Sequence, residues 1–253
     1  MGGLVRARRV PEIVLLAGAL LLASVTLLPR ARAGPPLAAL DPVEIWAEGF
    51  GDLRGIAVDG QGNVFVADRA VGSVTRIAPD GSRAPAASGL ERPIGLAFDP
   101  LGRLLIAEEK AARVVRVEAD GSRTVLVAGV KQPRWLATLE DGTLFVSARR
   151  LTRDIDPEPD DESAEPEVIL QLTPTGQLRV FADGFKQLQG LVATPTALFA
   201  ATQGRRGETR VDGVVFQIPL LPDGSAGVAQ PLGPADEFKK PVGPRAIAWA
   251  PSI

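Results

Sequence analysis

Three arginines recur at one position of a repeated sequence pattern, directly before an apolar stretch. They are Arg54, Arg134 and Arg245, and two other copies of the pattern have Ile94 and Gln189 there. Planar guanidinium groups bind carboxylates and phosphates through paired hydrogen bonds. If the copies surround a common centre, these arginines would form a funnel for an anionic ligand. In the alternative interpretation each arginine pairs with an acid of a neighbouring copy.

Acidic side chains occupy a second recurring position, at the end of the second apolar stretch. Asp68 and Glu108 stand there in two copies, and Ala148 in the third. The acids could pair with the arginines, bind a hard cation such as Ca²⁺, or cap a turn. Trp135 replaces a glycine of the other copies, either as a stacking platform for a sugar-like or aromatic ligand or as a filler of the central space. The predicted ligand-binding residues are Arg54, Asp68, Glu108, Arg134, Trp135 and Arg245.

Several kinds of chemistry are excluded by composition. The chain contains no His, Cys or Tyr, and its single Asn is Asn63. Ser-His-Asp and Cys-His arrangements are therefore impossible, tetrahedral zinc sites lose their usual ligands, and disulfides play no part in stability. Only carboxylates, Lys, Arg, Ser and Thr remain for acid-base or nucleophilic work. We therefore assign no catalytic residue and no metal ligand. The missing residue types argue against an enzyme without excluding one, and Ca²⁺ remains a candidate cofactor.

The elements that position these residues follow a period of 40. Glycines recur at that step, as do apolar positions such as Ile56, Leu96 and Leu136. After Ser147 the step becomes 55, and a less regular step of about 56 leads from Leu191 to Ile247. The recurring glycines are Gly49, Gly89 and Gly129; Gly62, Gly102 and Gly142; and Gly81 and Gly121. A fixed period of this length is typical of repeat architectures.

Each repeat contains four short β-rich segments separated by turns. In the first repeat we expect strands at 55–59, 64–68, 73–78 and, more weakly, 83–87. Asp-Gly pairs such as Asp80-Gly81 suit tight hairpins, which need residues that tolerate positive φ. A four-stranded meander has two apolar faces, so adjacent copies must stack face to face. Near-continuous apolar first strands such as 95–98 suit an inner position that is covered on both faces.

We therefore predict an all-β propeller of four-stranded antiparallel blades over residues 34–253. It would contain about four full blades, with an additional outer strand at 43–47 and an additional inner strand at 246–250. Such a count fits a truncated five- or six-bladed ring. A sandwich of the same strands is the alternative, but the fixed period argues against it.

The segment from Gly55 to Asp68, GIAVDGQGNVFVAD, resembles the repeat of NHL-type propellers and of the wider six-bladed, lactonase-like superfamily. Residues 95–108 are also similar to blades of soluble sugar dehydrogenases that use pyrroloquinoline quinone. The resemblance covers about residues 43–253 and implies the fold better than an activity. The quinone dehydrogenases and virginiamycin lyases of this superfamily depend on a histidine, which this chain lacks. The gluconolactonase branch holds a divalent cation with Glu, Asn and Asp near the axis, whereas Asn63 is expected in a hairpin turn.

Residues 1–33 read as an export signal. A basic start with Arg6, Arg8 and Arg9 precedes an apolar stretch over 13–28 and a small-residue cleavage motif at 31–33. Retention as an N-terminal membrane anchor is the alternative. Five of the 28 basic and one of the 30 acidic residues lie in this segment, which leaves a net charge of −6 for the remainder and argues against nucleic acid as a partner.

The longer step after Ser147 indicates an insertion in one repeat. Its acidic, proline-containing sequence at 154–162 shows no strand alternation and lacks the glycine of an EF-hand loop. We interpret it as a solvated surface loop. The segment Gly204-Arg205-Arg206-Gly207 occupies the same loop of the next repeat and would carry the opposite charge.

Two functions fit the sequence. The first is an exported, periplasmic or extracellular binding module whose partner is a small anionic or sugar-like ligand or another envelope protein, with membrane contact only through an uncleaved N-terminal segment. The second is a degenerate or truncated enzyme of the lactonase or sugar dehydrogenase type.

Overall fold

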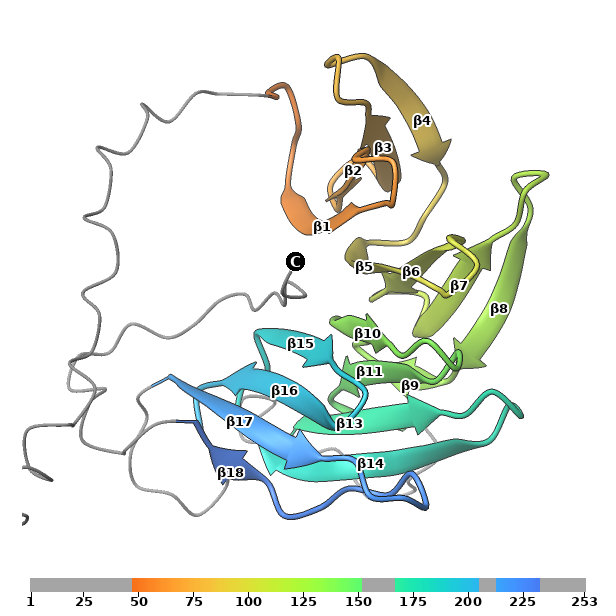
Figure 1. Ribbon diagram of the computed structural model, residues 1–253. Helices are drawn as coiled ribbons and strands as arrows, with labels where there is room; N and C mark the ends of the chain where they lie inside the picture. Colours follow the sequence, from red (N-terminus) through yellow and green to blue (C-terminus); the bar gives the residue numbers. More distant parts are fainter. Residues whose placement is uncertain (1–46, 152–166, 205–212, 233–253) are drawn as a thin grey trace, which may run out of the picture. The chain divides into compact units, whose positions relative to one another are not determined.

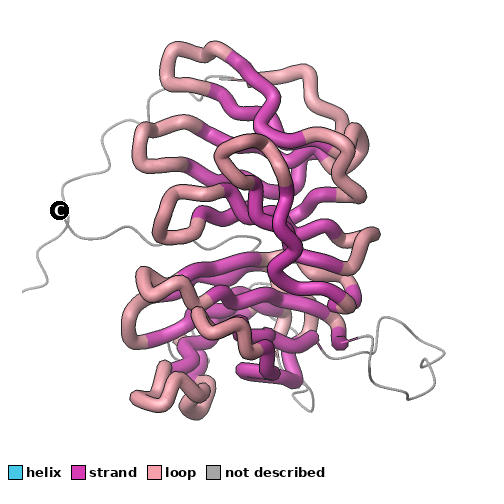
Figure 2. Tube along the Cα trace, turned by 90° about the vertical axis from the view of Figure 1, so that its right-hand side faces the viewer, coloured by secondary structure: helices cyan, strands magenta, loops and turns pink. Residues whose placement is uncertain are grey.

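A computed structural model of the chain describes residues 47–151, 167–204 and 213–232. Strands and the loops between them account for the described residues, as Figure 2 shows. Among these residues the structure has no helix with the length and apolar character needed to cross a bilayer. The predicted signal over 1–33, the outer strand predicted to begin at residue 43 and the inner strand predicted at 246–250 lie outside the described residues, apart from Ala47.

Four antiparallel sheets of four strands follow one another along the chain (Figure 1). Three of them are formed by consecutive strands, whereas the third omits one short strand that pairs in a separate two-stranded sheet. Blade 1 contains β1 (Leu53–Val58), β2 (Val64–Asp68), β3 (Ser73–Ile77) and β4 (Arg83–Ala87). Blade 2 contains β5 (Pro93–Phe98), β6 (Leu104–Glu108), β7 (Arg113–Val117) and β8 (Arg123–Ala128). Blade 3 contains β10 (Leu136–Thr138), β11 (Leu144–Ala148), β13 (Glu167–Leu172) and β14 (Leu178–Phe185). Blade 4 contains β15 (Gly190–Ala193), β16 (Ala197–Thr202), β17 (Val214–Pro219) and β18 (Gln230–Pro231).

The blades stack radially, because the first strands contact one another from blade to blade: β1 with β5, β5 with β10, and β10 with β15. Three apolar clusters fill the three described interfaces between blades 1 and 2, 2 and 3, and 3 and 4. At the interface of blades 1 and 2, Phe65 of β2 meets Phe98 of β5 edge to face, with ring centroids 5.0 Å apart. These clusters show that adjacent meanders bury the faces that they turn toward each other, so the predicted propeller is confirmed.

Tight hairpins close one end of every blade. In the first of them the Asp59 carboxylate accepts the N–H groups of Gln61 and Asn63, both at 2.9 Å, and Gly62 has a φ of +79°. The glycine of the Asp80-Gly81 pair has a φ of +81°, as the hairpin prediction requires. Local turn chemistry therefore sets the register of the blades at this end.

The strand bounds differ from the prediction in a few places. β1 begins at Leu53, two residues earlier than expected, because a bulge between Leu53 and Ile56 lets the strand continue its pairing with β2. A short pair that we did not predict joins β9 (Val130–Lys131) to β12 (Arg150–Leu151) beside blade 3. The first strand of blade 1 is also not covered on both faces as expected, since Ile56 and Val58 are exposed.

Candidate functional site

The predicted site residues that the structure describes lie at the end opposite to the tight hairpins. The loops before each first strand and the loops between second and third strands meet there, because the strands of each blade alternate in direction. Four residues separate β2 from β3, and four separate β6 from β7, whereas the corresponding connections of blades 3 and 4 are much longer. We call this side of the blades the loop end. Variable loops on a rigid scaffold are a common place for binding residues.

Asp68 uses its carboxylate to hold two backbone segments of blade 1. It accepts N–H groups from Gly51 at 2.7 Å and Asp52 at 3.1 Å, before β1, and from Ala70 at 3.1 Å and Val71 at 3.2 Å, after β2. The side chain is buried. Hydrogen bonding, above all from Gly51, keeps the pKa of this carboxyl below its ordinary value of 3.8. Asp68 therefore serves as a turn cap within its own blade.

Glu108 is in the equivalent position of blade 2 and is fully buried. It accepts the Glu91 N–H at 2.8 Å and the Nε–H of Arg113 at 2.6 Å. Glu91 is 40 residues after Gly51, so the same repeat position supplies the amide in both blades. The bond to Glu108 raises the pKa of Arg113 above its ordinary value. Both acids tie the start of their blade to the end of its second strand.

Blades 3 and 4 make this connection with other groups. Ala148 ends β11 without a carboxylate, and the Arg149 N–H donates to the Lys131 carbonyl at 2.9 Å. In blade 4 the fully buried Thr202 hydroxyl donates to the Lys186 carbonyl and accepts the Gly204 N–H. Our sequence reasoning missed Thr202, because its register follows a step of 54 from Ala148 rather than 55.

Arg69 links blade 1 to blade 2 at the loop end. Its guanidinium lies 3.2 Å from the Asp52 carboxylate and 3.2 Å from the Glu109 carboxylate. Its Nε is buried and has no hydrogen-bond partner among the residues that the structure describes. Arg69 lowers the pKa of Asp52 below the ordinary value of 3.8. Arg92 reaches the same Glu109 carboxylate at 3.3 Å.

Two of the predicted arginines join this network. Arg54 Nε lies 2.9 Å from Asp52, within its own blade. Arg134 of blade 3 lies 3.5 Å from Glu109 of blade 2 and 3.6 Å from Glu167 of its own blade. We call the resulting series of ion pairs the loop-end ion-pair chain. It runs from Arg54 through Asp52, Arg69, Glu109 and Arg134 to Glu167, and Arg92 also contacts Glu109. Arg245 lies outside the described residues.

A repeated backbone feature borders the ion-pair chain. Arg92, Gln132 and Gln187 occupy one repeat position, and all three have left-handed φ values between +48° and +57°. A non-glycine residue in this region costs about 1–2 kcal/mol. The strain is retained in three blades, where it places three long polar side chains at the loop end. Sequence reasoning missed this position because nothing in these residue types signals a positive φ.

Trp135 connects blade 3 to blade 4. The positions equivalent to it are Gly55 and Gly95, where the first strands approach so closely that a Cβ would meet the next blade's backbone. Trp135 instead donates its Nε1–H to the Leu188 carbonyl at 2.7 Å, and the buried Glu167 carboxylate accepts the Leu188 N–H. Both backbone groups of Leu188 are therefore bound by blade 3. Glu167 was missed because it is one of many acids near the insertion.

Burial raises the pKa of Glu167 above its ordinary 4.5, although the Leu188 N–H and Arg134 oppose this effect. A raised pKa in the folded state stabilises the fold below about pH 4.5, and this stabilisation is lost as the pH rises through the folded-state pKa. We expect Glu167→Gln, which keeps an acceptor for Leu188, to gain stability relative to the wild type between about pH 4.5 and 7. Urea denaturation over that range measures the difference, with the exposed Glu140→Gln as control. A gap that stays constant with pH would contradict the assignment.

Groups that could hold a metal ion are not brought together among the described residues, where no cluster of three or more Asp or Glu residues has suitable geometry. Asn63 is buried in its hairpin, donating to Asp59 at 2.7 Å and accepting from Arg76 at 2.7 Å. The Asn63 amide is therefore hydrogen-bonded at the hairpin end of blade 1, which is opposite to the loop end. The acidic segment 154–162 and Arg205 and Arg206 lie outside the described residues.

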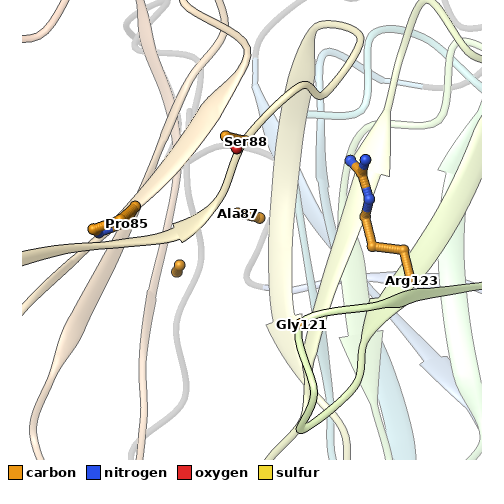
Figure 3. A pocket seen from close by; sticks show the side chains of 6 residues that line it. Pro85, Ala87, Ser88, Gly121 and Arg123 are labelled. Atoms are coloured by element: carbon orange, nitrogen blue, oxygen red, sulfur yellow. The ribbon is translucent and has the colours of Figure 1, made fainter.

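A separate hollow of about 320 Å³ lies on the outer side of blades 1 and 2. Figure 3 shows it between β4 and the turn that joins β7 to β8. Its lining residues are Pro85, Ala86, Ala87, Ser88, Gly121 and Arg123. It contains none of the predicted site residues and a single charged side chain, so the loop end remains the better candidate site.

Comparison with solved structures finds the same fold in proteins with different functions. A gluconolactonase from Xanthomonas campestris matches with a TM-score of 0.57 and 20% identity, over 74% of this chain and 64% of that one. An auxiliary nutrient binding protein from Bacteroides ovatus matches with a TM-score of 0.53 and 10% identity, over 73% of this chain and 43% of that one. A streptogramin B lyase matches with a TM-score of 0.50 and 12% identity, over 77% of this chain and 57% of that one. The chain thus spans less than two thirds of these structures.

No protein-family model and no curated protein matches the sequence. At these identities the matches establish the fold and leave the activity open. The resemblance to NHL-type and lactonase-like propellers is confirmed at the level of the fold. The chain is a β-propeller protein with the fold of the gluconolactonases.

Proposed function

We propose that this chain is an exported binding module that holds a small carboxylate-bearing ligand at its loop end. The observation that carries the proposal is the gathering of four arginines around three acids across blades 1 to 3. The arginines are Arg54, Arg69, Arg92 and Arg134, and the acids are Asp52, Glu109 and Glu167. Guanidinium groups in excess of carboxylates favour an anion with a planar, bidentate acceptor.

The arginines have donors to offer such a ligand. The side chains of Arg54 and Arg92 are 49% and 47% exposed, and each guanidinium carries five N–H groups. Arg69 is less exposed, at 22%, and its terminal nitrogens already contact Asp52 and Glu109. The left-handed backbone at Arg92 further supports a functional role for its side chain.

Binding is favoured over catalysis by the chemistry that the site offers. The arginines and their acids can position an anion, but no histidine, cysteine or tyrosine exists in the sequence to move protons or form a covalent intermediate. Burial raises the pKa of the Glu167 carboxyl, and its oxygens already bind the Leu188 N–H and Arg134. We also propose that the protein is exported, because residues 1–33 have the sequence pattern of an export signal.

The test is titration of the purified full chain with a panel of small carboxylates, among them gluconate, glucuronate and succinate, and with glucose as the neutral comparison. We expect saturable binding of at least one carboxylate in isothermal calorimetry, weakened at high salt. Arg92→Ala should weaken it at least about tenfold, since a hydrogen bond to a charged group contributes about 1.5–3 kcal/mol. Arg123→Ala, an exposed arginine on the outer side, serves as the matched control and should bind as the wild type does.

Three outcomes would contradict the proposal. One is the absence of binding by every carboxylate at millimolar concentration. Another is equal weakening by Arg92→Ala and Arg123→Ala. The third is turnover of a lactone panel in the presence of Ca²⁺, which would instead favour the lactonase function that the fold also supports.

A further inference from the structure

The first strand of blade 1 exposes an apolar face that no described blade covers. Ile56 is 69% exposed, Val58 59% and Leu53 49%. Ile56 pairs with Val66 and Val58 with Val64, so these residues belong to the side of the sheet that faces away from blade 2. Ala57 and Phe65 point to the other side, where they pack in the cluster shared with blade 2. A contiguous apolar face of this kind marks an interaction surface.

The repeat itself shows what covers this position elsewhere. The residues equivalent to Ile56 in blades 2, 3 and 4 are Leu96, Leu136 and Leu191, which are only 8%, 7% and 6% exposed. Leu96 is buried by blade 1, with Phe65 and Ala67 in its cluster, and a Cβ at Gly55 would lie 3.2 Å from the Leu96 side chain. The face of Ile56 therefore has the chemistry of an interior position, and no first strand covers it among residues 47–151, 167–204 and 213–232.

We propose that residues 246–250 of the same chain pack against this face of β1. This segment lies outside the described residues, and the repeat pattern predicts it as an inner strand, with Ile247 equivalent to Leu191. Ala246 and Ala248 then occupy the positions of Gly55 and Ala57, the small residues that cover Leu96 in the observed interface. The sequence Ala-Ile-Ala-Trp-Ala is uncharged, as a strand that covers this apolar face must be.

The connection is long enough for this contact. Fourteen residues separate the end of β18 at Pro231 from Ala246. An extended chain covers about 3.3–3.6 Å per residue, so this linker reaches roughly 45 Å. The proposed contact between residues 246–250 and β1 does not depend on ligand binding at the loop end. Either proposal can therefore be refuted without affecting the other.

The absence of native cysteine allows a direct test by disulfide cross-linking in the full chain. A disulfide requires Cβ atoms about 3.5–4.5 Å apart. We expect the pair Ile56→Cys with Ala246→Cys to oxidise within one molecule at least about ten times faster than Ile56→Cys with Val228→Cys. Val228 is 78% exposed beside β18 and lies outside the proposed contact. Non-reducing electrophoresis distinguishes the compact cross-linked monomer from a cross-linked dimer.

A second measurement keeps the test independent of disulfide geometry. The single variant Ile56→Cys should react with a thiol reagent at least about tenfold more slowly than Val228→Cys, and adding Ala248→Asp should restore its reactivity. Equal labelling rates of Ile56→Cys and Val228→Cys would overturn the proposal. Cross-linked dimers in place of the monomer would assign the face to a second copy of the chain. Protection that survives Ala248→Asp would assign it to another segment.

Discussion

Gly95→Ala is expected to destabilise the propeller by at least about 3 kcal/mol. A Cβ built on Gly95 would lie 1.7 Å from the Arg134 carbonyl oxygen and 2.9 Å from the Arg134 carbonyl carbon. Both atoms belong to backbone at the start of the next blade, so no side-chain rotation can relieve the clash. The first strands of blades 2 and 3 would have to separate, which disrupts the apolar cluster between these blades. Overpacking a close-packed interior generally costs about 1–3 kcal/mol, and a backbone clash lies at or beyond the upper limit.

The matched control is Gly60→Ala, in the hairpin that joins β1 to β2. A Cβ there would meet no atom within 4 Å, and this glycine does not have a positive φ. We expect its free energy of unfolding to stay within about 0.5 kcal/mol of the wild-type value. Urea denaturation of both variants, followed by tryptophan fluorescence, measures the difference. Equal stability of the two variants would show that the first strands do not approach as closely as the structure indicates.

The fold was predictable because its determinants are local and repeated. Hairpin residues such as Asp59 and Gly62 act within a few positions, and the continuous apolar run of a strand that is covered on both faces, such as β6, appears directly in the sequence. The period of 40 then places Leu96 relative to Ile56 without any knowledge of long-range contacts. The bulge in β1 was not predictable, because it depends on how the strand pairs with β2.

The sequence predicted where the candidate site residues lie, but it did not predict their hydrogen-bond and ion-pair partners. Repeat register placed Arg54, Arg134, Asp68 and Glu108 at one end of the blades, where the structure also has them. It did not show that Asp68 binds backbone amides, because the Gly51 N–H comes from a segment 17 residues earlier that returns through the meander. Three-dimensional proximity likewise determines the contacts between Arg69 and Glu109, which are 40 residues apart. The sequence of one repeat does not show which charged residue of the neighbouring blade lies close enough to form an ion pair.

The second large effect concerns Asp68→Ala, which we expect to cost about 2–4 kcal/mol at pH 7. The change removes one acceptor for four backbone N–H groups, those of Gly51, Asp52, Ala70 and Val71. A hydrogen bond to a charged group contributes about 1.5–3 kcal/mol, and a buried donor left without a partner costs about 1–3 kcal/mol, but water can reach part of this loop. Asp120→Ala, at an exposed turn where the carboxylate accepts the Ser122 N–H, is the control and should change stability far less.

The pH dependence separates the role of the charge from that of the shape. Because the folded-state pKa of Asp68 is depressed below 3.8, its ionised form stabilises the protein above that pH, and this stabilisation is lost as the pH falls through the folded-state value. The stability difference between wild type and Asp68→Asn should therefore be full at pH 7 and shrink steadily below about pH 4. Denaturation midpoints at pH 7, 4 and 3 measure this gap. If the gap kept its size down to pH 3, the carboxylate would act through its shape alone, and the amides around it would not be binding a charge.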